Sequence, residues 1–96
     1  MEEETLKKIR ELLEMSVVFG NDVILKPLIA INSVGKASTE DMASLTGIAV
    51  KDILFPVSVL EEIGYIFKSE LDGNTLRYAL DVKGKAFMDR FRIEGD

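Results

Sequence analysis

The sequence predicts a mainly α-helical domain that carries a small antiparallel β-hairpin, an α+β arrangement. Apolar residues recur every three or four positions through the first two thirds of the chain, as in helices that bury one face. The period then changes to two over 65–70 and 75–80, and Asp72-Gly73 between these segments is a strong hairpin signal. A length of 96 residues is typical of one domain, so we expect a single domain over 1–96.

The predicted elements follow one another without a linker. A flanking helix over 1–18 precedes a core over 22–92, and the expected helices cover 2–18, 22–34, 39–46, 49–63 and 82–92. Pro27 lies one turn into the second helix, so this helix either starts late or bends there. Pro56 is expected to interrupt helix 49–63, because the residue before a proline is biased towards an extended backbone. One form that this interruption can take is two short helices joined near Phe55.

Three motifs resemble segments of known protein families. Residues 42–48 (MASLTGI) resemble LAExxGL, the pattern of a second helix and its turn. Residues 59–66 (VLEEIGYI) resemble xLEExGxI, the end of a recognition helix, and residues 80–85 (LDVKGK) resemble LTxKGK, the entry to a later helix. Three helices followed by a hairpin form the winged helix-turn-helix arrangement. Over about 22–91 the chain resembles the MarR, ArsR and PadR families of prokaryotic transcriptional regulators.

The resemblance implies a dimeric regulator that binds double-stranded DNA with helix 49–63 and the wing at 65–80. In those families the third helix enters the major groove, and the wing contacts the minor groove or the backbone. The positions that correspond here give candidate DNA contacts at Ser38, Thr39, Lys51, Ser58, Lys68 and Arg77. Helix capping is the alternative role for Ser38 and Thr39. For Lys68 and Arg77 the alternative is an ordinary solvated hairpin.

The charge distribution predicts weak DNA binding. The net charge is −5, Lys51 is the sole basic residue of helix 49–63, and that helix has no Arg, Asn or Gln. Those three residue types include the commonest readers of base edges. Because few phosphates can be neutralised, we expect a modest salt dependence of binding. A protein–protein interaction module with weak or no DNA binding is therefore the alternative function.

Apolar residues of helix 49–63 divide into two faces. Ile53, Val57 and Leu60 have the spacing of an inward face. Leu54, Phe55 and Val59 fall mostly outward and form a patch that requires a partner. That partner is another protein, a dimer mate or another part of the same domain.

The first helix has an amphipathic stripe of its own at Leu6, Ile9 and Leu13. This stripe can pair with the last helix at Phe87 and Phe91, or across a two-fold axis, or it can cover only its own core. We favour a homodimer, because an added amphipathic helix at the end of a small domain is a common way to build one.

Composition excludes several function classes. The chain has neither cysteine nor histidine, which rules out disulfides, thiolate metal sites and nucleophiles activated by histidine. Because no acid–base pair or phosphate-binding loop is recognisable, we expect no enzymatic activity, cofactor or metal. The acidic start of the chain does not resemble a signal peptide, and no apolar run approaches a membrane span. A cytoplasmic protein without membrane contact is the expectation.

Overall fold

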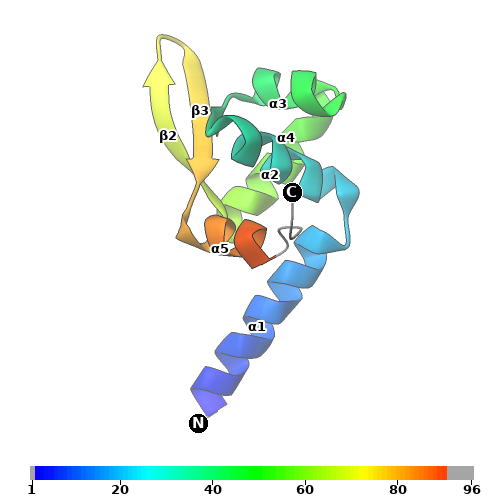
Figure 1. Cartoon of the computed structure of the whole chain (residues 1–96), viewed down its shortest axis with the longest axis vertical. Helices are drawn as coiled ribbons and strands as arrows, with labels where there is room; N and C mark the ends of the chain where they lie inside the picture. Colours follow the sequence, from blue (N-terminus) through cyan, green and yellow to red (C-terminus); the bar gives the residue numbers. More distant parts are fainter. Residues whose placement is uncertain (1, 91–96) are drawn as a thin grey trace.

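The structure, a computed structural model, describes residues 2–90 and confirms the mainly α-helical fold with its hairpin (Figure 1). The described elements are α1 (Glu2–Phe19), α2 (Asp22–Val34), β1 (Lys36–Ala37), α3 (Thr39–Thr46), α4 (Val50–Glu62), β2 (Ile66–Asp72), β3 (Thr75–Leu80) and α5 (Val82–Arg90). The predicted order of helices and hairpin strands is confirmed, and β1 is an addition to it.

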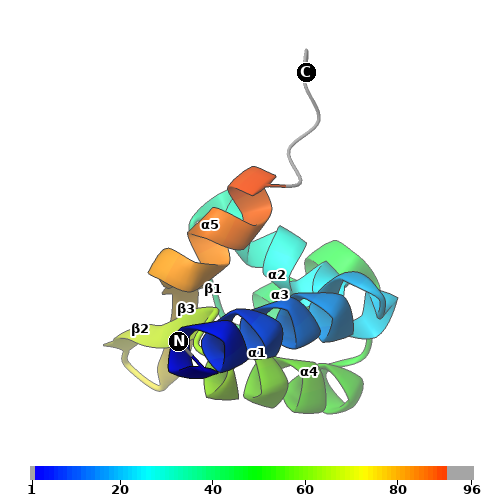
Figure 2. The same ribbon diagram turned by 90° about the horizontal axis from the view of Figure 1, so that it is seen from below.

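Helix α2 lies at the centre of the domain. It contacts α1, α3, α4, α5, β1 and β3, and Figure 2 shows it between α5 and α4. The helix begins where predicted, because the side chain of Asn21 accepts a hydrogen bond of 3.0 Å from the backbone N–H of Val23. It continues through Pro27 to Val34, so it does not start late.

Helix α4 is one continuous helix, and the predicted interruption at Pro56 is wrong. A proline inside a helix removes one backbone hydrogen bond, but tertiary packing can offset this loss. Here Pro56 is buried on the same face as Ile53, Val57 and Leu60, the three residues predicted to point inward. Burial of this face therefore outweighs the local preference of Phe55 for an extended backbone.

The sheet is antiparallel with the strand order β1-β3-β2. Strand β2 is longer than predicted, because Asp72 pairs with Thr75 and leaves Gly73-Asn74 as a two-residue turn. The register shifts between Lys68 and Glu70, which marks a β-bulge in β2.

Helix α5 packs very closely against the residue that precedes β2. The carbonyl oxygen of Tyr65 accepts a hydrogen bond of 2.9 Å from the N–H of Asp81, and a Cβ at Gly84 would lie 2.1 Å from the same oxygen. Only glycine fits there. The Tyr65 ring lies 5.2 Å from the ring of Phe87, which is 3% exposed. The prediction that Phe87 contacts a partner is therefore wrong, because its side chain belongs to the core of its own domain.

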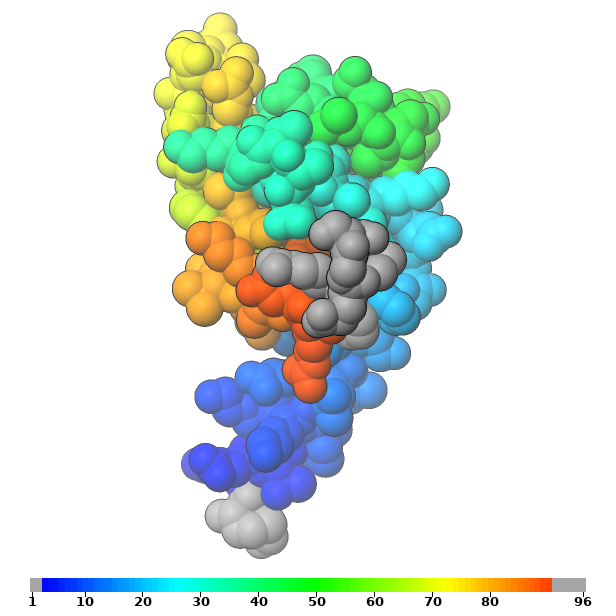
Figure 3. All heavy atoms as spheres, viewed as in Figure 1, coloured from blue at the N-terminus to red at the C-terminus, as the bar shows by residue number. Residues whose placement is uncertain are grey.

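Helix α1 projects from the rest of the molecule, as Figure 3 shows, and its far end contributes to the 47 Å long dimension. Only its last turns join the core, through buried Val18 and half-buried Met15. The predicted stripe at Leu6, Ile9 and Leu13 is exposed, so the alternative that it covers its own core is wrong. Within residues 2–90 no single helix has the length and apolar composition to cross a membrane. Two pairs of consecutive helices meet both criteria only when each pair is counted as one segment, and both pairs are sharply bent: α1 with α2, and α3 with α4.

Candidate nucleic-acid interface

Helices α3 and α4 form a helix-turn-helix. Their directions differ by 112°, and residues 47–49 connect them. Gly47 ends α3 with a φ of 78°, a left-handed conformation that other residues rarely adopt. The hydroxyl of Thr46 donates to the carbonyl of Met42 and accepts from the N–H of Ile48, at 2.7 and 3.2 Å. These hydrogen bonds hold the turn and set the angle of α4.

The start of α3 is held by a reciprocal pair of hydrogen bonds. The Ser38 hydroxyl accepts from the N–H of Asp41 at 3.0 Å, and the Asp41 carboxylate accepts from the N–H of Ser38 at 3.1 Å. Ser38 is buried, so the structure gives it the capping role that the sequence offered as an alternative to DNA contact. Thr39 is half-exposed beside it.

The outer face of α4 is mostly apolar and acidic. Leu54 is 54% and Phe55 is 70% exposed, so two of the three predicted outward apolar residues are confirmed. Val59 is half-buried and packs against the core instead. Lys51 and Ser58 are exposed on this helix, as a DNA-contacting role requires.

The basic side chains of the hairpin are paired with carboxylates. The Lys68 ammonium lies 3.6 Å from the Glu61 carboxylate at the end of α4. The Arg77 guanidinium lies 3.6 Å from Glu70 and 3.8 Å from Asp72. Each predicted wing cation therefore has an anionic neighbour, which lowers the positive potential that the wing presents to a polyanion.

One of these carboxylates also reaches a cation that sequence reasoning missed. Glu70 accepts a hydrogen bond of 2.8 Å from the Lys36 ammonium, and this hydrogen bond and charge hold the pKa of Glu70 below its ordinary value. Arg77 adds to the effect. Lys36 belongs to β1, which has two residues, so no periodicity could have identified it.

Lys83 joins the flanking helix to the end of α4. Its ammonium donates to the Glu14 carboxylate on α1 at 2.6 Å and to the carbonyl oxygen of Ile63 at 3.0 Å. The same ammonium lies 5.9 Å from the centroid of the Tyr65 ring. The exposed apolar side of α1 also includes Leu12, which is not among the predicted partner contacts. Phe91, the remaining predicted partner contact, lies outside the described residues.

Parts of the elements with candidate DNA contacts gather at one end of the molecule, whereas Lys68 lies beside Glu61 at the far end of α4. Figure 1 shows α3, the start of α4 and the hairpin turn at the end opposite the N-terminus of α1. Among residues 2–90, no group of three acidic side chains is arranged to hold a metal ion.

No protein-family profile and no curated protein sequence matches the chain, whereas several solved structures do. Reduced HlyU from Vibrio cholerae has a TM-score of 0.73 and 15% identity, over 91% of this chain and 90% of that one. The transcriptional repressor BigR from Xylella fastidiosa has a TM-score of 0.70 and 17% identity, over 98% and 99%. The chain has a winged helix-turn-helix fold. BpsR from Bordetella bronchiseptica, whose DNA binding is regulated by 6-hydroxynicotinic acid, shares this winged helix with a TM-score of 0.67 and 16% identity, over 94% and 70%.

Proposed function

We propose that this winged helix is a DNA-binding transcriptional regulator that contacts duplex DNA with α4 and the β2–β3 wing. The observation that carries the proposal is the helix-turn-helix at 112°, with α3, the start of α4 and the hairpin turn at one free end of the molecule (Figure 1). Solved regulators that share the fold, such as BigR, support the same role.

The charges of this face predict weak, non-specific contact with the backbone. Lys51 is the one basic residue that α4 offers, and Lys68 and Arg77 are engaged with carboxylates. Each phosphate that a protein neutralises contributes about 0.9 to the slope of log affinity against log salt. Three cations therefore give a slope of about three or less. Thr39 and Ser58 add hydroxyl groups that can donate to phosphates.

The regulator would act as a homodimer through α1. Leu6, Ile9 and Leu13 lie at helical spacing and are exposed on a helix that projects from the domain. A two-fold arrangement of α1 would remove these side chains from water.

Sedimentation velocity tests the dimer. Wild type is expected to sediment as a dimer, whereas Leu13→Asp places a charge in the apolar stripe and should give a folded monomer. Circular dichroism of the variant establishes that the fold is kept. A monomeric wild-type protein would contradict the dimer.

The DNA-binding proposal is tested by a mobility-shift assay with random-sequence duplexes at low salt, repeated at higher salt. Replacement of Lys51, Lys68 and Arg77 by alanine is expected to abolish retention. The matched control replaces Lys8, Lys26 and Lys85, which are exposed on α1, α2 and α5 and carry the same total charge. This control should bind as wild type does. Equal loss in both triple variants would mean that only net charge matters.

The exposure of Leu54 and Phe55 favours a second candidate, a protein–protein interaction module. Absence of DNA retention by wild type even at low salt would favour it. Leu54→Ala or Phe55→Ala would then disrupt a complex or a dimer, while the lysine and arginine replacements would change nothing.

A further inference from the structure

One carboxylate on the outer face of the sheet bridges two cations from different strands. Glu70 of β2 places one oxygen 2.8 Å from the Lys36 ammonium and the other 3.6 Å from the Arg77 guanidinium. Strand β3 lies between β1 and β2, and its register pairs Lys36 with Ala79 and Arg77 with Glu70. Because side chains alternate along a strand, Lys36, Arg77 and Glu70 all lie on one face.

The β-bulge is what brings Glu70 to this face. Ile66 and Lys68 pair with Leu80 and Tyr78, the residues of β3 whose side chains are buried. Regular alternation would put Glu70 on that same inner side. The register shift between Lys68 and Glu70 instead places Glu70 opposite Arg77. The bulge thus assembles a three-residue cluster that a regular strand would not contain.

We propose that Lys36 and Arg77 form a binding site for a backbone phosphate of DNA, and that Glu70 occupies this site until a phosphate replaces it. The inference rests on the proposed DNA-binding function. A carboxylate presents two oxygens to an ammonium and a guanidinium, and a backbone phosphodiester presents its two non-bridging oxygens with the same single negative charge. Glu70 therefore occupies the position that a phosphate would take.

The exposure of the cluster makes this replacement feasible. The side chains of Lys36, Glu70 and Arg77 are 53%, 39% and 35% exposed, and ion pairs in water at this exposure are weak. A duplex supplies many phosphates and releases counterions when cations bind them. The replacement needs only a rotation of the Glu70 side chain, because the backbone of β2 stays paired with β3.

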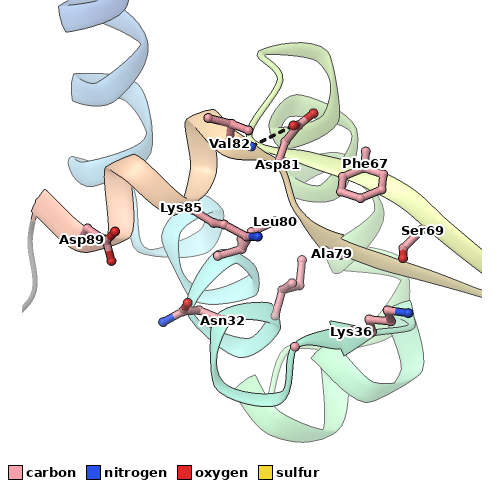
Figure 4. A pocket seen from close by; sticks show the side chains of 12 residues that line it. Asn32, Lys36, Phe67, Ser69, Ala79, Leu80, Asp81, Val82, Lys85 and Asp89 are labelled. Atoms are coloured by element: carbon pink, nitrogen blue, oxygen red, sulfur yellow. Dashed lines mark hydrogen bonds between the residues drawn. The ribbon is translucent and has the colours of Figure 1, made fainter.

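The location of the cluster agrees with a role at the DNA-binding end. Lys36 lies two residues before Ser38, which caps α3, and Arg77 lies in the strand that follows the hairpin turn. Figure 4 shows Lys36 near Ser69 and Ala79, and all three line a hollow of about 720 Å³ between the sheet, α2 and α5. Arg77 lies outside this hollow, but its side chain is 35% exposed, so a phosphate can approach both cations from solvent.

The test compares the DNA affinity of the full chain and its Glu70→Gln variant on a random-sequence duplex at several salt concentrations. Removal of the carboxylate is expected to raise the affinity about threefold to tenfold at low salt and to steepen the salt slope by between about one and two. Adding Lys36→Ala and Arg77→Ala to Glu70→Gln should remove the gain. Melting curves of each variant establish that the fold is kept.

Two controls separate this site from a general effect of charge. Glu4→Gln removes the same charge from exposed α1 and should leave the affinity unchanged. Asp72→Asn removes a carboxylate that contacts Arg77 but not Lys36, and should give a smaller gain than Glu70→Gln. An equal gain in all three variants, or a gain that survives loss of Lys36 and Arg77, would overturn the inference while leaving DNA binding intact. Absence of retention for every variant at low salt would overturn the DNA-binding proposal itself, and this inference with it.

Discussion

A methyl group at position 84 is expected to destabilise the domain strongly. The Cβ of Gly84→Ala would lie 2.1 Å from the carbonyl oxygen of Tyr65 and 3.0 Å from its carbonyl carbon, whereas carbon atoms in contact ordinarily lie about 3.5 Å or more apart. Helix α5 would have to move by roughly 1 Å. That movement also lengthens the hydrogen bond of 2.9 Å from Asp81 to Tyr65.

The magnitude follows from opposing contributions. Overpacking costs about 1 to 3 kcal/mol, and weakening this backbone hydrogen bond costs about 1 kcal/mol more. Alanine is favoured over glycine inside a helix by about 1 kcal/mol, which opposes these costs. A net loss of about 2 kcal/mol is expected, and for a domain of this size it lowers Tm by roughly 8 to 16 °C.

Urea and thermal unfolding followed by circular dichroism measure this loss. Ala86→Gly serves as the matched control, because Ala86 is exposed on the same helix and reports the helix-propensity contribution alone. The control should lose about 1 kcal/mol. A Gly84→Ala variant as stable as wild type would refute the close packing of α5 against Tyr65.

Three further predictions follow from hydrogen bonds and ion pairs. Ser38→Ala should lower the stability measured by thermal unfolding by about 1 kcal/mol, because α3 loses its N-terminal cap. Ser38→Thr should keep most of the wild-type stability, because threonine also has a hydroxyl group that can cap the helix. A Ser38→Ala variant as stable as wild type would contradict the capping role. The pKa of Glu70 is lowered by Lys36, so this pair contributes stability above pH 4.5 that is lost as the pH falls through the lower folded value. The free energy of unfolding, measured in urea, should therefore depend less on pH below 4.5 for Glu70→Gln than for wild type. The same pH dependence in both proteins would contradict a stabilising pair of Glu70 and Lys36. Lys83→Met should speed amide hydrogen exchange in α1 while global stability falls by less than about 1 kcal/mol, and unchanged exchange would show that Lys83 does not hold α1.

The elements that the sequence predicted correctly are those whose residue pattern extends over several helical turns or over a complete hairpin. Ile53, Val57 and Leu60 recur at helical spacing and all three are buried on α4. Glycine and capping signals placed the ends of α3, as the capping box at Ser38 confirms. In these segments the local preference of the chain and its tertiary packing agree.

The remaining features depend on contacts between distant segments. Pro56 and Phe55 signalled a break, but burial of the inner face keeps α4 continuous. Phe87 lies on the side of α5 that meets Tyr65, 22 residues earlier, and helical spacing cannot say which neighbour covers it. The bulge beside Glu70 reverses the alternation of side chains between the two faces of β2. The sequence of β2 alone therefore could not predict that Glu70 contacts Lys36.

The position of Lys83 has a thermodynamic consequence. Its ammonium donates to both the Glu14 carboxylate on α1 and the Ile63 carbonyl that follows α4, so a displacement of the ammonium changes both contacts. A change in the orientation of α1 therefore carries a coupling free energy with the conformation at the end of α4. By reciprocity, a molecule that displaces the end of α4 would also redistribute the orientations of α1.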